Sequence, residues 1–398
     1  MTIKGLYLDI SDWFWLLGRS KYMNRIFTFL LLQSVCLGAL LAQPNRRTQD
    51  ESTLPGKRSE LNVRNATYPR LLPGNRIEFK IKAPDAQKVQ IDLGRKYDLV
   101  RNTNGEWSCI TDSLTQGFHY YFLIINGVSV ADPASESFYG CSMMASGVEI
   151  PYPDGDTRFH IANVPHGDIR IKRYFSKTAN NWRRMFVYCP PGYDTSTQSY
   201  PVLYLQHGGG EDERGWSNQG RTDIIMDNLI AKGKAEPMII VMTDGNTNDF
   251  ENELLKECIP FIEKNFRVKA NRNNRALAGL SMGGIQTLNA GIPNLDYFAY
   301  LGVFSSGWWA NPTPFGGGND TEKYYKMLQN KKDDYNTKLK QFWISMGGKE
   351  DIAYNNCQIM MKRFDQIGIK YTYFETPGGH TWPVWRESLY QFAPLLFK

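Results

Sequence analysis

The stretch "RALAGLSMGGIQTLNAG", residues 275–291, sets one serine between two glycines where an apolar strand runs into an apolar-periodic helix. In this G-x-S-x-G pattern, Gly279 and Gly283 permit a strand-to-helix turn in which any side chain would clash. The turn lifts the Ser281 hydroxyl out of the packing, at a helix N-terminus that favours developing negative charge. A tight turn with an incidental serine is the alternative, but the position between strand and helix favours a nucleophile.

Strands and helices alternate on either side of this turn. We expect strands at 168–176, 183–190, 201–207, 237–243, 275–280, 299–305, 341–347 and 370–376, and helices near 221–232, 251–265, 283–291, 353–367 and 383–396. Apolar strands separated by amphipathic helices predict a mostly parallel, eight-stranded sheet with helices on both faces. With the serine turn, this pattern predicts an α/β-hydrolase fold for residues 151–398.

The preceding part of the chain has a different pattern. Between residues 66 and 150, alternating strand candidates at 76–83, 88–94, 106–111 and 118–127 are separated by turn signals such as "APDA" and "NTNG". No helical period appears, so we expect a small all-β, immunoglobulin-like sandwich. Residues 43–65 are polar and contain proline, which predicts a tether.

The N-terminal region resembles a targeting segment. From Met23 the text is "MNRIFTFLLLQSVCLGALLAQPNRR", with one arginine, an apolar run from Ile26 to Leu41 and small residues ending at Ala42. This predicts a signal peptide at 23–42 and a secreted or periplasmic protein. The run is short for a membrane span, so no membrane insertion is expected after its removal. Residues 1–42 then comprise an upstream extension and the signal, with Met23 as the expected start; a buried helix or a lipoprotein at Cys36 are the alternatives.

Charge and cysteine content limit the partners. The net charge of +6 over 398 residues comes from interleaved acidic and basic residues, so nucleic acid is not an expected partner. After the signal an odd number of cysteines remains without close spacing, which predicts no disulfide framework; Cys109 with Cys141 is the one pair that could bridge. No C-x-x-C or H-E-x-x-H pattern is present, and we expect neither metal nor organic cofactor.

A serine nucleophile needs a base and an acid. The chain order nucleophile, acid, histidine requires a late histidine, and of the five in the sequence His380 in "TPGGHTW" satisfies it. The acid should follow the strand before the last, where "ISMGGKEDIAYNN" offers Glu350 and Asp351. We prefer Asp351, and Glu350 remains the alternative.

The remaining site candidates bind substrate or the oxyanion. In "YLQHGGGEDERGW" the N–H of Gly209, paired with that of Met282, is the expected oxyanion hole, and His207 is expected to brace this loop; a plain strand-end turn is the alternative. Three tryptophans are candidates for an aromatic substrate wall, each with core packing as the alternative: Trp308, Trp309 and Trp382. The segment 132–147 is a candidate for lying across the site.

At these motifs the sequence resembles a known family. "YLQHGGGEDERGW", "RTDIIMDNLIAKGKAEPMIIVMTDGN", "RALAGLSMGG", "GKEDIAYNN" and "GGHTWPVWRESLYQF" are similar to carbohydrate esterase family 1, which contains bacterial feruloyl esterases; siderophore esterases and mycolyltransferases are more distant relatives. The resemblance covers roughly 165–398. It implies Ser281, Asp351 and His380 as the triad, with Gly209 and Met282 as oxyanion donors.

The upstream sandwich is similar to the carbohydrate-binding-like domain that often precedes such esterases and glycogen-branching enzymes. Trp107 is the only tryptophan in it, so sugar binding and a purely packing role both stay open.

The function implied by the resemblance is that of a secreted serine ester hydrolase acting on feruloylated or acetylated plant polysaccharide or oligosaccharide. It would release ferulate or related hydroxycinnamates, with acetate as a further product. The alternatives are a siderophore esterase or an acyltransferase of the same fold, and a non-catalytic carbohydrate-binding protein.

Overall fold

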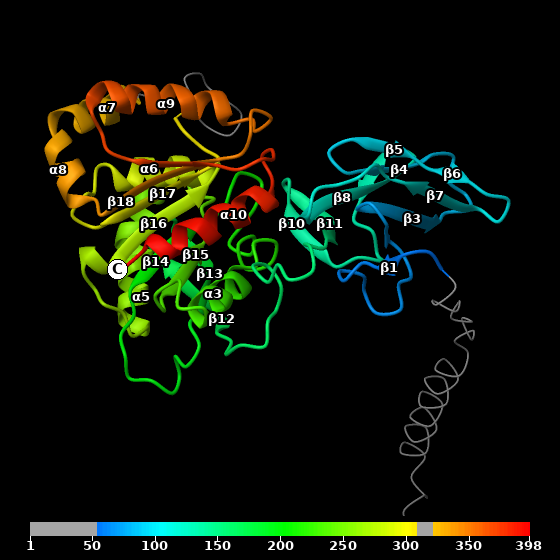
Figure 1. Cartoon of the computed structure of the whole chain (residues 1–398), viewed down its shortest axis with the longest axis horizontal. Helices are drawn as coiled ribbons and strands as arrows, with labels where there is room; N and C mark the ends of the chain where they lie inside the picture. Colours follow the sequence, from blue (N-terminus) through cyan, green and yellow to red (C-terminus); the bar gives the residue numbers. More distant parts are fainter. Residues whose placement is uncertain (1–53, 309–320) are drawn as a thin grey trace, which may run out of the picture. The chain divides into compact units, whose positions relative to one another are not determined.

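The computed structural model describes residues 54–308 and 321–398, and residues Pro55–Lys398 form one compact unit (Figure 1). The predicted signal peptide at 23–42 and the candidate Trp309 lie outside the described residues.

Residues 57–150 form two antiparallel sheets that share an apolar core. The first sheet has the order β1(Lys57–Arg58), β2(Arg70–Leu72), β3(Arg76–Lys82), β7(Glu106–Ile110), β6(Val100–Arg101). The second has the order β10(Ser137–Gly140), β11(Met143–Ile150), β8(Gly117–Ile125), β4(Val89–Asp92), β5(Lys96–Asp98), and β9(Val128–Val130) pairs with β8. Alternate residues of the facing strands, including Phe79, Ile91 and Tyr121, fill the space between the sheets.

The sandwich differs from the sequence prediction at its edges. The four predicted strands are present as β3, β4, β7 and β8, but the eight-residue strand β11 was missed. Strand β1 pairs with β2 and lies inside the predicted tether 43–65, so ordered structure begins before residue 66. Trp107 is buried in the core, where its Nε1 donates to the carbonyl of Ala83 at 2.8 Å. Its ring is therefore not an exposed platform for sugar.

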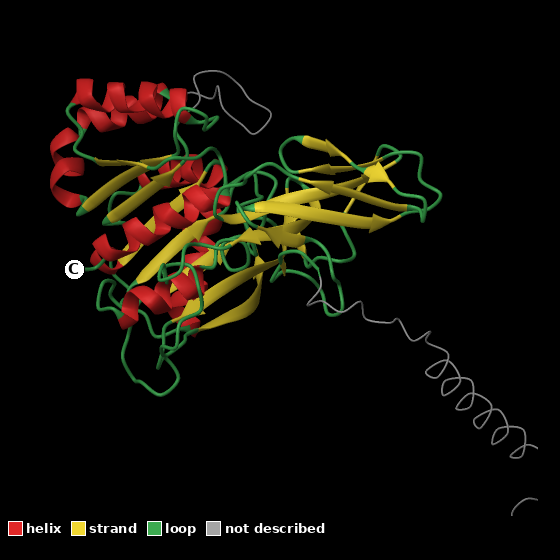
Figure 2. Ribbon diagram, turned by 45° about the vertical axis from the view of Figure 1, so that its right-hand side comes forward, coloured by secondary structure: helices red, strands yellow, loops and turns green. Residues whose placement is uncertain are grey.

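The rest of the chain is built on the predicted eight-stranded sheet (Figure 2). Its order is β12(Asp168–Ser176), β13(Asn181–Cys189), β15(Ile239–Thr243), β14(Val202–Gln206), β16(Arg275–Leu280), β17(Tyr300–Phe304), β18(Gln341–Met346), β19(Thr372–Glu375). Strand β13 runs antiparallel to β12 and β15, and the other neighbouring pairs are parallel. The mostly parallel sheet of an α/β-hydrolase fold is thus confirmed.

Helices cover both faces of this sheet, as Figure 2 shows. The helical segments are α3(Thr222–Ala231), α4(Phe250–Asn252), the π-helix η2(Glu253–Cys258), α5(Ile259–Asn265), the 3₁₀ turn η3(Arg272–Asn274), α6(Met282–Gly291), α7(Glu322–Asn330), α8(Lys332–Lys338), α9(Tyr354–Ile367), α10(Trp382–Phe392) and the 3₁₀ turn η4(Ala393–Leu395). Successive residues of the central strands point into apolar cores on opposite faces of the sheet. Tyr204 packs in the core formed with α5, α6 and α9, whereas Leu203 packs in the core formed with α3 and α10. Because both strand faces are buried, the strands are almost continuously apolar.

A buried ion pair joins the two parts of the compact unit. Arg386 of α10 donates from Nη1 and Nη2 to the two carboxylate oxygens of Glu149 on β11, at 2.6 and 3.1 Å, and from Nε to the carbonyl of Gln219 at 2.7 Å. Both charged side chains are at most 2% exposed. The pair therefore fixes the last strand of the sandwich to the helix that follows the candidate base.

Replacing one partner of this pair should destabilise the protein strongly. We expect Arg386→Met to lower the free energy of unfolding by about 3–5 kcal/mol, because it leaves the Glu149 charge buried without its main partner. Urea unfolding monitored by circular dichroism measures the change. The matched control is Arg363→Met, which removes an exposed pair with Glu322 and should cost at most about 1 kcal/mol. A loss at Arg386 as small as that of the control would contradict this account.

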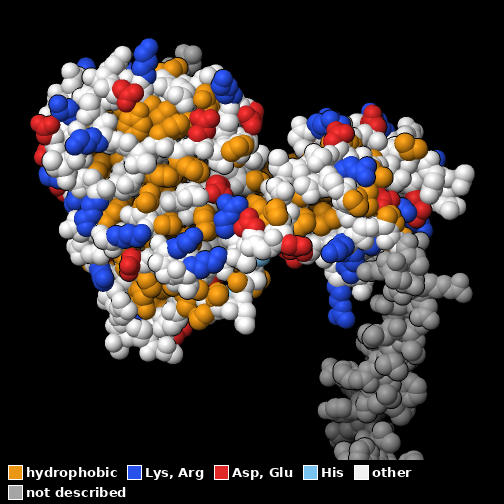
Figure 3. Space-filling view, in the orientation of Figure 1, with side chains coloured by type: hydrophobic (Ala, Val, Ile, Leu, Met, Phe, Trp, Pro, Cys, Tyr) orange, Lys and Arg blue, Asp and Glu red, His pale blue; other side chains and the backbone are white. Residues whose placement is uncertain are grey.

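The surface is mixed in character. On the face drawn in Figure 3, Lys and Arg side chains are interspersed with Asp and Glu and with small apolar patches. None of the helices within residues 54–308 and 321–398 is both long and apolar enough to span a bilayer. The five cysteines in these ranges, Cys109 and Cys141 included, are free thiols.

Candidate active site

Ser281 occupies a strained turn between β16 and α6. Its φ of 51° and ψ of −117° lie in a region that side-chain-bearing residues rarely adopt. The turn is possible because its flanks are glycine: a Cβ on Gly279 would lie 2.5 Å from the carbonyl of Gly283, and a Cβ on Gly283 would lie 2.6 Å from the carbonyl oxygen of His207. Close backbone packing therefore accounts for both glycines of the motif.

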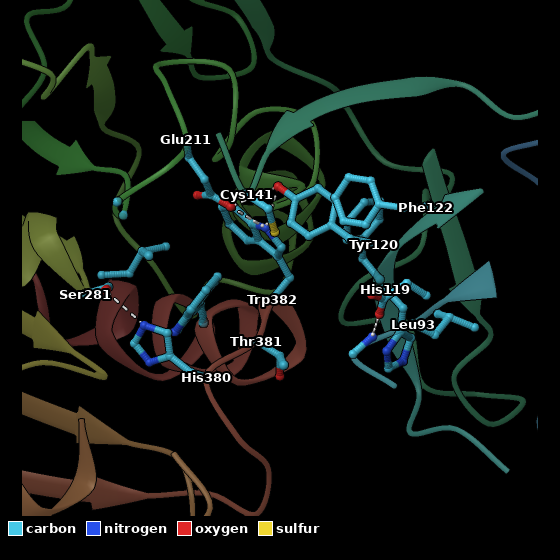
Figure 4. Close-up of a pocket in the computed structure, with 17 residues that line it drawn as sticks. Leu93, His119, Tyr120, Phe122, Cys141, Glu211, Ser281, His380, Thr381 and Trp382 are labelled. Atoms are coloured by element: carbon cyan, nitrogen blue, oxygen red, sulfur yellow. Dashed lines mark hydrogen bonds between the residues drawn. The ribbon is translucent and has the colours of Figure 1, made fainter. Parts of the chain in front are cut away.

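A chain of hydrogen bonds runs from this serine to a buried carboxylate, and Figure 4 shows its first bond, between Ser281 and His380. His380 Nε2 lies 2.9 Å from Ser281 Oγ, and His380 Nδ1 lies 2.8 Å from Asp351 Oδ1. With Asp351 ionised, Nδ1–H donates to it and leaves Nε2 free to accept from the serine hydroxyl. This is the tautomer that a general base needs.

Asp351 is held in its ionised form. Burial alone would raise the pKa of this carboxyl, but the hydrogen bond and charge interaction with His380 outweigh it and hold the pKa below its usual range. Oδ1 also accepts from the backbone N–H of Ala353 at 2.9 Å. Glu350, the alternative acid, has an exposed side chain, so the structure brings Asp351 and not Glu350 to the histidine.

The fold explains why these distant residues meet. Ser281 follows β16, Asp351 follows β18 and His380 follows β19, and these strands are parallel members of one sheet. Loops at the carboxyl ends of parallel strands converge at the same edge. The glycine-rich loop after β14 joins them there.

The loop after β14 contains Gly209, one of the two predicted oxyanion donors, and Met282, the other, is the first residue of α6. Within residues 54–308 and 321–398, neither the N–H of Gly209 nor that of Met282 has an acceptor in the protein. Gly208 packs so closely on the elbow that a Cβ there would lie 3.3 Å from Ser281 Cβ. His207 bridges the neighbouring loop: its Nδ1 lies 2.8 Å from the carbonyl oxygen of Gly208, and its Nε2 accepts from the N–H of Gly245 at 2.8 Å. His207 thus braces the loop, as expected.

A cavity of about 400 Å³ opens beside the serine and the histidine. Figure 4 shows its labelled side chains: Ser281 and His380 lie on one side, and Tyr120 and Phe122 of the sandwich strand β8 lie on the other. The turn after β10 contributes Cys141, and the N–H of Ser142 donates to the carbonyl of Gly210 at 2.8 Å. Part of the candidate segment 132–147 therefore reaches the site.

The three predicted tryptophans have different locations. Trp382 lines the cavity and is 2% exposed. Trp308 takes the core-packing alternative and is not part of the substrate wall: it lies in the core under α7, stacked on Tyr324 with ring centroids 5.3 Å apart, and its Nε1 donates to Asn289 at 2.9 Å. Trp309 is outside the described residues.

Sequence reasoning missed a polar network at the back of the cavity. Glu211 Oε1 accepts from Tyr120 Oη and from Trp382 Nε1, each at 2.9 Å, and Gln219 Nε2 donates to Tyr120 Oη. Burial raises the pKa of Glu211 to about 7. The network connects the oxyanion loop, the helix after His380 and the sandwich. The sequence contained one sign of this network: in "GEDER" the acidic residue Glu211 directly follows the glycines of the oxyanion loop.

In the part of the chain that the structure describes, no group of three or more His, Cys, Asp and Glu side chains is arranged to hold a metal ion. The hydrogen-bonded groups supply the chemistry of a serine, a histidine and a carboxylate. The backbone donors at Gly209 and Met282 stay a prediction.

Comparisons with known proteins place the chain in a family. The Esterase family model matches residues 176–396. A curated relative, the endo-1,4-beta-xylanase/feruloyl esterase of Xylanibacter ruminicola, is 34% identical in an alignment 380 residues long that covers 90% of this chain and 49% of the relative. The chain therefore spans about half the length of that relative.

Solved structures show the same fold. A ferulic acid esterase of Anaeromyces mucronatus, solved in complex with ferulic acid, superposes with a TM-score of 0.53 at 25% identity and covers 62% of this chain and 96% of its own. The enterobactin esterase of Shigella flexneri superposes with a TM-score of 0.60 over 80% of this chain and 92% of its own, but at 16% identity this likeness concerns the fold alone.

Proposed function

The chain belongs to the Esterase family, and from that premise we propose that it is a serine esterase that releases ferulate and related hydroxycinnamates from plant cell-wall xylan. One observation carries the proposal: the hydrogen-bonded series Ser281, His380, Asp351 opens into a cavity whose lining includes five aromatic side chains, Phe118, Tyr120, Phe122, Trp382 and Trp385. The feruloyl esterase relatives support the choice of acyl group.

The geometry supplies a two-step acyl transfer. Ser281 Oγ attacks the ester carbonyl carbon while His380 Nε2 takes the hydroxyl proton, and Asp351 stabilises the imidazolium. The N–H groups of Gly209 and Met282 stabilise the oxyanion, each contributing roughly 3 kcal/mol to the transition state. The sugar alcohol leaves with the proton from His380. Water then attacks the acyl-enzyme, His380 again accepts the proton, and the free acid is released as Ser281 is restored.

The proposal includes an exported enzyme. Its support is the predicted signal peptide at 23–42 and the nature of the substrate, a wall polymer outside the cell. Acetate remains a further candidate product.

A substrate series tests the acyl preference. We expect methyl ferulate and feruloylated arabinoxylan oligosaccharides to be hydrolysed with a kcat/KM at least about tenfold above that of methyl acetate, which has the same leaving group as methyl ferulate, because an acetyl group leaves the cavity unfilled. Initial rates followed by chromatography of the released acids give the ranking. Preference for methyl acetate, or no turnover of any ester, would contradict the proposal.

A further inference from the structure

We infer that the sandwich strand β8 forms the wall of the acyl site that selects a planar aromatic group, with Phe122 as a specificity-determining residue. The inference rests on the proposed function, which it deepens by naming residues that recognise the acyl group. It makes the sandwich part of the active site.

The first observation is the side-chain pattern of β8. Tyr121 and Leu123 point into the sandwich core. The residues that alternate with them, Phe118, Tyr120 and Phe122, lie on the opposite face of the strand and line the cavity beside Ser281. In an antiparallel sandwich the outward face is normally polar because it meets water. Phe118 and Tyr120 pack in one apolar cluster with residues of the α/β part of the chain, and the half-buried Phe122 continues this aromatic face along the cavity.

The second observation is that most of this wall is fixed before any ligand arrives. Phe118 packs edge-on against Tyr120, with ring centroids 4.9 Å apart. It also lies against Gly147 of β11, where a Cβ would come within 2.6 Å of the ring. The hydroxyl of Tyr120 is held by Glu211 at 2.9 Å. A preorganised wall loses little entropy when a ligand binds.

The third observation is the position of Phe122 relative to the nucleophile. It is half-buried, lines the cavity, and lies across it from Ser281 and His380 (Figure 4). An ester whose carbonyl sits at Ser281 must extend its acyl chain through the cavity to reach this ring. A hydroxycinnamoyl group ends in a planar ring suited to stack on an aromatic side chain. An acetyl group ends one carbon beyond the carbonyl and has no ring to stack on this side chain.

The test compares two esters with small alcohol portions and different acyl groups, methyl ferulate and vinyl acetate. For each ester, kcat/KM of the variant is divided by that of the unaltered chain, so that the different leaving groups cancel. We expect Phe122→Ala to lower kcat/KM for methyl ferulate about tenfold or more and to change that for vinyl acetate less than twofold. Phe122→Tyr keeps the ring and should therefore retain the preference for ferulate that Phe122→Ala loses. The matched control is Phe175→Ala, an exposed phenylalanine on β12, which should leave the ratio unchanged.

A binding measurement separates ring contact from an effect on the chemical step. In the Ser281→Ala background, calorimetric titration with methyl ferulate should give a Kd about tenfold weaker when Phe122 is also alanine. An unchanged ferulate-to-acetate ratio and an unchanged Kd in Phe122→Ala would overturn the inference while the proposed function stands. If the unaltered chain hydrolyses vinyl acetate but not methyl ferulate, both are overturned.

Discussion

Ser281→Ala is expected to lower kcat for methyl ferulate by roughly 10⁴–10⁶-fold while the protein stays folded. The loss is large because the hydroxyl oxygen is the atom that forms the acyl-enzyme, and its hydrogen bond to His380 Nε2 at 2.9 Å has no substitute. The fold is kept because alanine retains the Cβ and the strained backbone. The N–H of residue 281 still donates to the carbonyl of Phe304, and its carbonyl still accepts from Ser306 Oγ.

The measurement is single-turnover hydrolysis of methyl ferulate together with the thermal unfolding midpoint. Ser113→Ala, at an exposed serine of the sandwich, is the matched control and should behave like the unaltered chain. A Ser281→Ala protein that unfolds normally yet retains more than about 1% of the activity would refute the assignment of the nucleophile.

The second large effect is expected at Asp351. Replacement by asparagine should lower kcat roughly 10⁴-fold, because an amide no longer fixes the histidine with Nδ1 protonated and no longer stabilises the imidazolium. The side chain of Asp351 is fully buried and bonded to His380 at 2.8 Å, so the isosteric amide disturbs the protonation state more than the packing.

Glu350→Gln provides the control for Asp351, since it changes the neighbouring carboxylate that is exposed. It should retain at least half of the kcat. Equal losses at both positions, or a larger loss at Glu350, would contradict the arrangement seen in the structure.

The catalytic geometry was largely predictable from the sequence because its determinants are local. A glycine–serine–glycine turn, a late histidine in a glycine-rich loop and an acidic residue after the penultimate strand each leave a short signature, and parallel strands bring them to one edge. Choosing Asp351 over Glu350 depended on which of two adjacent side chains turns inward. That is decided by the turn in which the N–H of Ala353 donates to Asp351.

The cavity wall was not predictable in the same way, because it depends on contacts between residues far apart in the chain. The aromatic residues of β8 were read as a strand, but nothing local shows that Tyr120 meets Glu211, 91 positions later. The choice between substrate wall and core packing stayed open for Trp308 because the helix that covers it, α7, was not predicted. Tyr324 and Tyr325 of α7 pack against the ring of Trp308, so this ring belongs to the core.

Strand β11 illustrates a related limit. Its sequence "MMASGVEI" contains small residues and a glutamate, which weaken the strand signal, yet its last six residues are buried. Gly147 is required because two phenylalanine rings occupy the space of a side chain, and Glu149 is tolerated because Arg386 neutralises it. Both reasons lie in the tertiary structure.

Covalent labelling with a fluorophosphonate, followed by mass spectrometry of the proteolytic peptides, tests the central claim most directly. If residue 281 is a serine activated by His380, the adduct will form on the peptide that contains Ser281 and will fall sharply in the His380→Ala variant. An unlabelled protein, or a label on any other serine, would contradict the account and leave a non-catalytic carbohydrate-binding protein as the better description.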